Sequence, residues 1–200
     1  MMEQHHAELY ALEVQRQYSF ASIAYQSLRS ELLNRGPDWQ LRAFAAAQAI
    51  LTSAAQTSKL FWPFPPDSDQ SDRVKRAIAR GEYLQEIIGP DPVLMSRNVR
   101  NSVEHYDDRL DAFFSKDTTS GLYESLIGSK ASKYAHGKVV WLRHLDPETM
   151  VYSFLGKEVH LEKLVVAMRE ASAAANRWID GPSLTALLQE EAARVAQLDE

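Results

Sequence analysis

The segment from Gln4 to Asn34, QHHAELYALEVQRQYSFASIAYQSLRSELLN, decides the fold class of this chain. It contains no proline, and its apolar residues recur at intervals of three and four, which is the spacing of one helix face. Those residues are Leu9, Leu12, Tyr18 or Phe20, Ile23, Tyr25, Leu28 and Leu32. Gly36 and Pro37 follow, and this pair commonly ends a helix. The sequence therefore predicts a long amphipathic helix at the start of a mainly α-helical protein.

Further helices are predicted downstream, separated by short polar or proline-containing connections. Their predicted ranges are Asp38 to Lys59, Arg73 to Ile88 with an interruption at Gly81 left open, and Leu94 to Phe114. Residues 44–51 are rich in alanine, which permits close approach of a neighbouring helix. The aromatic and proline-rich stretch 61–66 cannot continue a helix and is expected to cap the core rather than line a groove. Four helices with short connections predict antiparallel neighbours in a bundle.

After Phe114 the sequence changes character. Residues 115–137 are rich in Ser, Thr, Gly and Lys, and they predict a long irregular connection. Between residues 138 and 160, β-branched and aromatic segments alternate with turn residues, which predicts a small antiparallel β-meander. A helix is expected from Leu161 to Ile179. Residues 1–180 thus form one predicted domain, and 181–200 a C-terminal helix or tail, with a helix from Ser183 to about Leu198.

The bulk composition limits the class of protein. The chain has 200 residues, no cysteine and a formal charge of −5, so a disulfide scaffold, a thiolate metal site and a broadly basic nucleic-acid surface are not expected. Neither a signal peptide nor a membrane span is evident, which predicts a cytoplasmic protein without membrane contact. The sequence has no phosphate-binding glycine loop or dinucleotide fingerprint, and no cofactor or metal is predicted.

The predicted helix from Leu94 to Phe114 carries the chemically functional side chains. Its apolar residues form one stripe that belongs in the core, and the remaining positions hold groups that bind anions or transfer protons. Arg-Asn occurs there twice, although asparagine is a poor helix former. The stripe comprises Val99, Val103, Tyr106, Leu110 and Phe113, and the polar residues are Arg97, Asn98, Arg100, Asn101, Glu104, His105 and Asp108.

This segment resembles the HEPN superfamily, a group of helical-bundle proteins marked by an arginine, four to six intervening residues and a histidine. Arg100-Asn101-Ser102-Val103-Glu104-His105 fits with four intervening residues and a polar residue after the arginine. Arg97 is too far from the histidine to fit. The resemblance covers about residues 4–114, and it implies a HEPN-like antiparallel bundle.

The resemblance also implies a metal-independent endoribonuclease in which two copies of the motif meet across a homodimer. Arg100 would bind the phosphate and His105 would transfer the proton. Asn101 and Glu104 would orient them, with Arg97 and Asn98 in support. RNA, a second copy of the chain and a neutralising protein partner are the expected partners of such a toxin-like protein.

Two alternatives to catalysis remain open. In one, the same polar helix forms the interface of a non-catalytic homodimeric interaction module. In the other, it is a solvated face with ion pairs at i, i+4 spacing, such as Arg100 with Glu104. Geometry separates the three, because catalysis requires Arg100 and His105 of two chains to line one open cleft.

Overall fold

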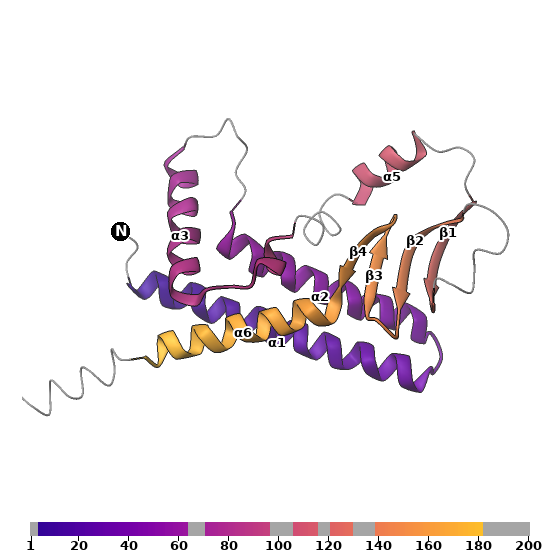
Figure 1. The fold of residues 1–200 in the computed structure, drawn as a ribbon, viewed down its shortest axis with the longest axis horizontal. Coiled ribbons are helices and arrows are strands. Elements are labelled where there is room, and N and C mark those ends of the chain that lie inside the picture. The colour runs from indigo at the N-terminus through magenta and orange to yellow at the C-terminus, as the bar shows by residue number, and fades with distance from the viewer. Residues whose placement is uncertain (1–3, 64–70, 97–105, 116–120, 130–138, 182–200) are drawn as a thin grey trace, which may run out of the picture.

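The computed structural model describes residues 4–63, 71–96, 106–115, 121–129 and 139–181. Its helices are α1 (Gln4–Asn34), α2 (Trp39–Phe61), α3 (Asp72–Ile88), the 3-10 helix η1 (Pro92–Met95), α5 (Tyr106–Phe114) and α6 (Leu161–Ile179). Its strands are β1 (Gly121–Ile127), β2 (Val139–Asp146), β3 (Val151–Phe154) and β4 (Lys157–His160). In Figure 1, α1, α2 and α6 form the body of the molecule, with α3 at one end and the sheet at the other. The protein is therefore mainly helical, as predicted.

Helix α1 has the predicted bounds, but it buries only part of the predicted face. Leu28 is fully buried, and Tyr18, Tyr25 and Leu32 pack against the core. Leu9, Leu12, Phe20 and Ile23 are 53%, 46%, 52% and 66% exposed. The buried residues of α1 are mostly small: Ala7, Ala11, Val14, Ala21, Ala24 and Leu28. They face α6 and residues of α2 that are also small, which include Ala43, Ala46, Ala47 and Ala54. Small side chains on both helices let the backbones approach closely. Close packing against α2 and α6 therefore decides which side of α1 is buried, more than the hydrophobicity of its side chains does.

Helix α3 continues through Gly81, so the interruption considered there does not occur. A Cβ at Gly81 would lie 2.5 Å from the Phe61 carbonyl oxygen and 2.7 Å from Pro63 Cδ. The missing side chain thus allows α3 to contact the end of α2. Phe61 is fully buried, which confirms the predicted core-capping role for this aromatic residue; residues 64–66 of the same stretch lie outside the described part of the chain.

The four strands form one mixed sheet in the order β1-β2-β3-β4. The antiparallel pairs β2–β3 and β3–β4 match the prediction in part, because the predicted antiparallel meander forms only three strands of a mixed sheet. The prediction of an irregular connection over 115–137 is wrong for residues 121–127, because they form β1 and pair in parallel with β2. A strand that gains its hydrogen bonds from a later segment carries little local signal in its own composition.

The predicted helix from Leu94 to Phe114 is wrong at its start. Leu94 belongs to η1, whose turn is closed by Asp91 Oδ1 accepting from the Val93 N–H at 2.7 Å, and Ser96 leaves helical geometry with a ψ of 116°. Pro92 suits the first turn of a short helix because it has no N–H to satisfy. Helix α5 accounts for residues 106–114 of the prediction, and residues 97–105 lie outside the described ranges.

Helix α6 matches its prediction at both ends. The predicted helix from Ser183 to Leu198 falls outside the residues that the structure describes. Among the described helices, none combines the length and apolar content needed to cross a bilayer.

Candidate functional site

All six residues singled out by the sequence lie in a segment that the structure does not describe. Arg97, Asn98, Arg100, Asn101, Glu104 and His105 fall within residues 97–105. The chain enters this stretch from η1 and leaves it into α5. A cleft lies nearby, between α2 and strands β1 and β2.

The upstream end of the motif segment is attached to the core through η1. Leu94 is 1% exposed and belongs to the main core cluster. Val93 packs against the same cluster, and η1 contacts both α2 and α6. The chain therefore enters the motif segment from a position fixed against two long helices.

The downstream end is attached through α5. The Arg109 guanidinium carbon lies 5.8 Å from the centre of the Phe154 ring, and Leu110 packs against the main core cluster. Burial lowers the pKa of Arg109 below its ordinary value. Arginine keeps its charge even so, and the face of an aromatic ring favours a cation that has lost part of its water. Asp107 and Asp108 lie exposed in the first turn of α5, where carboxylates interact favourably with the helix dipole.

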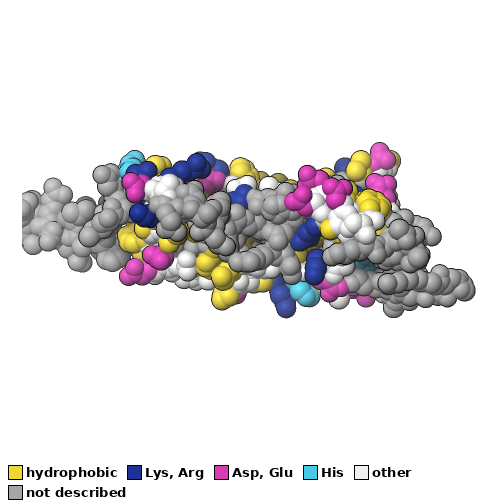
Figure 2. Space-filling view, turned by 90° about the horizontal axis from the view of Figure 1, so that it is seen from above, with side chains coloured by type: hydrophobic (Ala, Val, Ile, Leu, Met, Phe, Trp, Pro, Cys, Tyr) yellow, Lys and Arg dark blue, Asp and Glu magenta, His cyan; other side chains and the backbone are white. Residues whose placement is uncertain are grey.

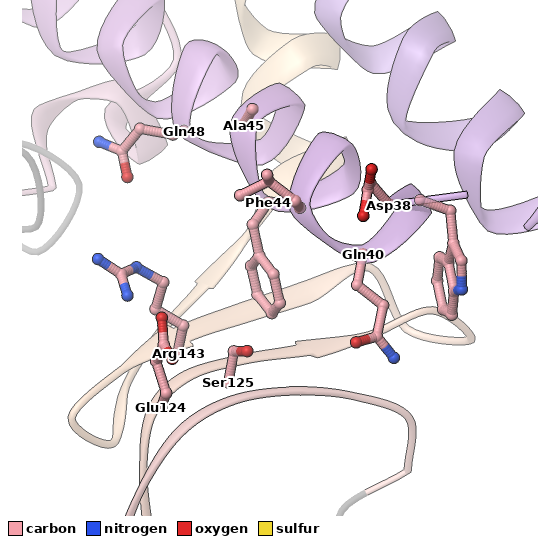
Figure 3. Close-up of a pocket in the computed structure, with 10 residues that line it drawn as sticks. Asp38, Gln40, Phe44, Ala45, Gln48, Glu124, Ser125 and Arg143 are labelled. Carbon is pink, nitrogen blue, oxygen red and sulfur yellow. The ribbon is translucent and has the colours of Figure 1, made fainter. Parts of the chain in front are cut away.

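A cleft of about 910 Å³ separates the first turns of α2 from strands β1 and β2. Figure 3 shows Gln40 and Phe44 pointing from α2 toward the sheet, with Glu124, Ser125 and Arg143 on the opposite wall. The full lining consists of Asp38, Trp39, Gln40, Leu41, Phe44, Ala45, Gln48, Glu124, Ser125 and Arg143. Phe44 is held in place by Tyr152 on β3, with the ring centres 6.4 Å apart in an edge-to-face arrangement.

The lining combines aromatic surface, side-chain amides and a single guanidinium. Aromatic rings stack on bases of any sequence, and amides can pair with the polar edges of those bases. Asp38 and Glu124 add two carboxylates, whose negative charge disfavours binding of several phosphates. The cleft therefore suits a planar polar group with few charges better than a polyphosphate.

Strand register connects this cleft to α5. Arg143 on β2 stands directly opposite Phe154 on β3, and Phe154 is the residue that holds Arg109. Ser125 on β1 is the partner of Arg143 on its other side. One row of residues across the sheet thus joins the cleft wall to the helix that begins one residue after His105.

The sequence signal for this cleft was limited to one wall. Gln40, Phe44 and Gln48 recur at intervals of four and share one helix face, a polar–aromatic–polar pattern that could have been noticed. The opposite wall includes β1, which was not predicted, so the cleft could not be assembled from sequence.

Two polar side chains away from the cleft, His144 and Arg80, have structural roles. His144 is 1% exposed, and its Nε2 lies 2.7 Å from the Gly128 carbonyl oxygen, so it joins β2 to the end of β1. Arg80 on α3 donates to the Lys59 carbonyl at 3.0 Å and lies over the Tyr10 ring. Within the described ranges no group of three or more His, Asp or Glu side chains could hold a metal ion.

The described surface gives no broad basic face in the view of Figure 2, where Lys and Arg lie interspersed with Asp and Glu. Comparison of the chain with models of known families, with curated proteins and with solved structures finds no match. Inferences about function therefore rest on the motif and on the geometry around it.

Proposed function

We propose that the chain is a HEPN-like protein that cleaves RNA without a metal, at a composite site formed by two copies. The observation that carries the proposal is the segment from Arg100 to His105, in which four residues separate the two side chains and the polar Asn101 follows the arginine. The mainly helical architecture on either side of it supports the resemblance to an antiparallel bundle.

The chemistry follows from the two side chains. The His105 imidazole accepts the proton of a ribose 2′-hydroxyl while the 2′-oxygen attacks the adjacent phosphorus. The bond from phosphorus to the 5′-oxygen breaks, and that oxygen takes a proton from water to leave as a hydroxyl, while the proton on His105 returns to solvent. The products carry a 2′,3′-cyclic phosphate and a 5′-hydroxyl. The Arg100 guanidinium binds two phosphate oxygens and offsets the charge that develops on them.

A composite site explains how side chains five positions apart can act together. On one helix, residues five apart point about 140° from each other. Arg100 of one copy and His105 of the other can face the same phosphate if the segments meet across a two-fold axis. Attachment through Leu94 on one side and through Arg109 and Leu110 on the other supports this arrangement, because fixed ends reduce the conformations that the segment must give up.

The cleft between α2 and the sheet is the proposed path for the flanking single strand. Trp39 and Phe44 offer stacking surface, and Arg143 offers one cationic contact. Because Asp38 and Glu124 line the cleft, contacts with the bases are favoured over purely electrostatic contacts with the phosphate backbone.

The test is cleavage of an end-labelled RNA pool in chelator, by wild type and by Arg100→Ala and His105→Ala. Arg169→Ala and His160→Ala are matched controls, since both residues are exposed and lie outside the motif. Both motif variants should lose activity, the controls should keep it, and the products should carry cyclic phosphate ends. Light scattering in parallel checks that every variant remains a dimer.

Mixing the two inactive variants tests the composite site directly. Each mixed dimer holds one intact pair, Arg100 from one chain and His105 from the other, so on the order of a quarter of wild-type activity should return. A mixture that stays inactive, although the subunits exchange, would refute the shared site. An inactive wild type with an intact dimer would instead identify a non-catalytic homodimeric interaction module.

A further inference from the structure

Helix α1 carries an exposed stripe on the side away from the core. Its members lie within about 80° of arc on the helix, at intervals of 3, 4, 4 and 3 residues. They are Leu9, Leu12, Arg16, Phe20 and Ile23. The four apolar members are between 46% and 66% exposed, and the Arg16 side chain is 64% exposed. Four large apolar side chains in one row are a costly surface to leave in water.

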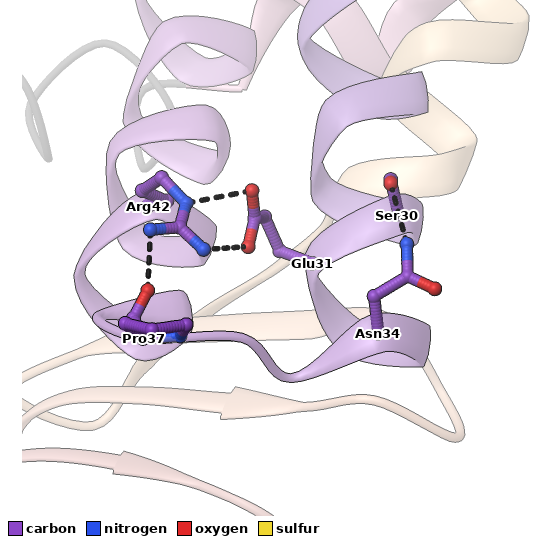
Figure 4. Close-up of polar contacts among 5 residues, drawn as sticks. All are labelled: Ser30, Glu31, Asn34, Pro37 and Arg42. Carbon is purple, nitrogen blue, oxygen red and sulfur yellow. Dashed lines mark hydrogen bonds and ion pairs between the residues drawn. The ribbon is translucent and has the colours of Figure 1, made fainter.

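A groove of about 420 Å³ runs beside this stripe, between α1 and α2. Phe20 and Ile23 form one side, and the lining from α2 is mostly alanine, at residues 45, 46 and 49. Arg42 also lines the groove, but Glu31 neutralises it through two hydrogen bonds of 2.7 and 2.8 Å, and the Pro37 carbonyl accepts a further one (Figure 4). The groove therefore has an apolar lining whose one charged side chain is neutralised, so it can accept an apolar helix face.

The C-terminal sequence from 183 to 198, SLTALLQEEAARVAQL, repeats the pattern of the stripe. Each stripe position on α1 corresponds to a residue 175 positions later. Leu9, Leu12, Phe20 and Ile23 correspond to Leu184, Leu187, Val195 and Leu198, and the basic residue Arg16 corresponds to the acidic residue Glu191. The two rows have equal length, about 21 Å as helices, and opposite charge at the middle.

The described chain ends beside the start of the stripe. Trp178 and Ile179, at the end of α6, pack against the same small core cluster as Tyr10 on α1. Residues 180–183 then separate α6 from Leu184, and Asp180-Gly181-Pro182 is a sequence that breaks a helix. A segment that leaves from this point can run along α1 in the same direction, with Leu184 near Leu9.

We propose that residues 184–198 of this chain form a helix that docks parallel to α1 on the stripe and completes the helical layer. Burial of Leu184, Leu187, Val195 and Leu198 against the stripe removes both apolar rows from water. Glu191 faces Arg16, which forms an exposed ion pair of 3.1 Å with Glu13 three residues away. The inference is independent of the nuclease proposal.

The charge at the centre of the stripe argues against a second copy of α1 as the occupant. Arg16 is the midpoint of the interval from Leu9 to Ile23. Two copies of α1 that meet through this stripe, whether parallel or antiparallel, would place Arg16 opposite Arg16, and like charges in direct contact disfavour association. Residues 184–198 place a carboxylate there instead.

The test uses the absence of native cysteine. The full-length double variant Ile23→Cys with Leu198→Cys should form an intramolecular disulfide in dilute solution, since the parallel register brings these positions together. The control Ile23→Cys with Leu184→Cys places the thiols about 21 Å apart along the helices and should stay reduced. No disulfide in the first variant, equal yield in both, or covalent dimers in place of the internal bond would each overturn the proposal.

A charge exchange tests the register in the background of the first double variant, Ile23→Cys with Leu198→Cys. Arg16→Glu and Glu191→Arg should each reduce the yield of the internal disulfide severalfold, and the two together should restore it. Arg16 is exposed, so its replacement does not disturb the core of α1. Equal yields in all four proteins would show that the two charges do not meet.

Discussion

The guanidinium of Arg109 lies over the ring of Phe154, 5.8 Å from its centre, and this contact attaches the helix that follows the proposed catalytic histidine to the sheet. Phe154 is 1% exposed and stands opposite Arg143, a residue of the cleft wall. The strand that holds α5 through Phe154 therefore also pairs with the strand that carries Arg143 in the cleft wall.

Replacement of Arg109 should loosen α5. We expect Arg109→Ala to lower stability by about 1 kcal/mol, the size of a partly exposed cation–π contact, and to speed amide exchange in residues 107–114. Arg109→Lys should recover only part of the protection, because lysine keeps the charge and loses the planar stacking surface. Hydrogen exchange by mass spectrometry measures both. Unchanged exchange in Arg109→Ala would show that Leu110 alone holds the helix.

The cleft should contribute to binding of single-stranded RNA more than to its cleavage. Trp39→Ala should weaken binding by roughly 1–3 kcal/mol if a base stacks there, while activity at saturating RNA changes little. Leu41→Ala is the matched control, since Leu41 lines the same cleft but offers no aromatic face. Fluorescence anisotropy with a noncleavable 2′-deoxy-substituted oligonucleotide gives the affinities. Equal affinities for the two variants would place the RNA elsewhere.

Gly81→Ala should destabilise the protein although alanine is the better helix former. The new Cβ would meet the Phe61 carbonyl oxygen at 2.5 Å, so α3 must move away from α2. Such overpacking costs roughly 1–3 kcal/mol, more than the gain of about 1 kcal/mol from helix propensity. Glu82→Ala, at the next and exposed position, should be close to neutral. A denaturant titration in which Gly81→Ala is the more stable variant would contradict the close approach.

The Glu31–Arg42 pair should make stability depend on pH at the acid end. Hydrogen bonds from the Arg42 guanidinium hold the pKa of Glu31 below its ordinary value of 4.5. Because the folded pKa is the lower one, the stabilisation is complete above pH 4.5 and is lost as pH falls through the folded pKa. Glu31→Gln should therefore melt below wild type at neutral pH, and the difference should shrink under acid. Thermal melts at several pH values test this, and a constant difference would exclude the linkage.

Enlarging a buried alanine in α2 should separate α1 from α2. Ala47 is fully buried, and Ala47→Leu should cost roughly 1–3 kcal/mol through overpacking. Gln56→Leu adds a similar apolar side chain at an exposed position of the same helix and should change stability little. Equal unfolding midpoints for the two variants would mean that the alanine face tolerates a wider helix spacing.

Local sequence determined where most described helices begin and end. Gly36-Pro37 after α1 and Asp180-Gly181 after α6 end helices through backbone constraints that act within a few residues. For the same reason the turn residues of the β2–β4 meander were readable, since Asp146 accepts from the Glu148 N–H two residues away. The motif from Arg100 to His105 is likewise a property of spacing along the chain, and its role stays a prediction.

Tertiary structure decided what those elements contact. The exposed side of α1 holds Leu9 and Phe20, and its buried side holds alanines, because close contact with α2 and α6 depends on shape as well as on hydrophobicity. Residues 121–127 became a strand only because β2 supplies their hydrogen-bond partners, and the cleft exists only where that strand faces α2. Backbone limits are local and can be read from sequence, whereas packing and strand pairing join residues that are distant along the chain.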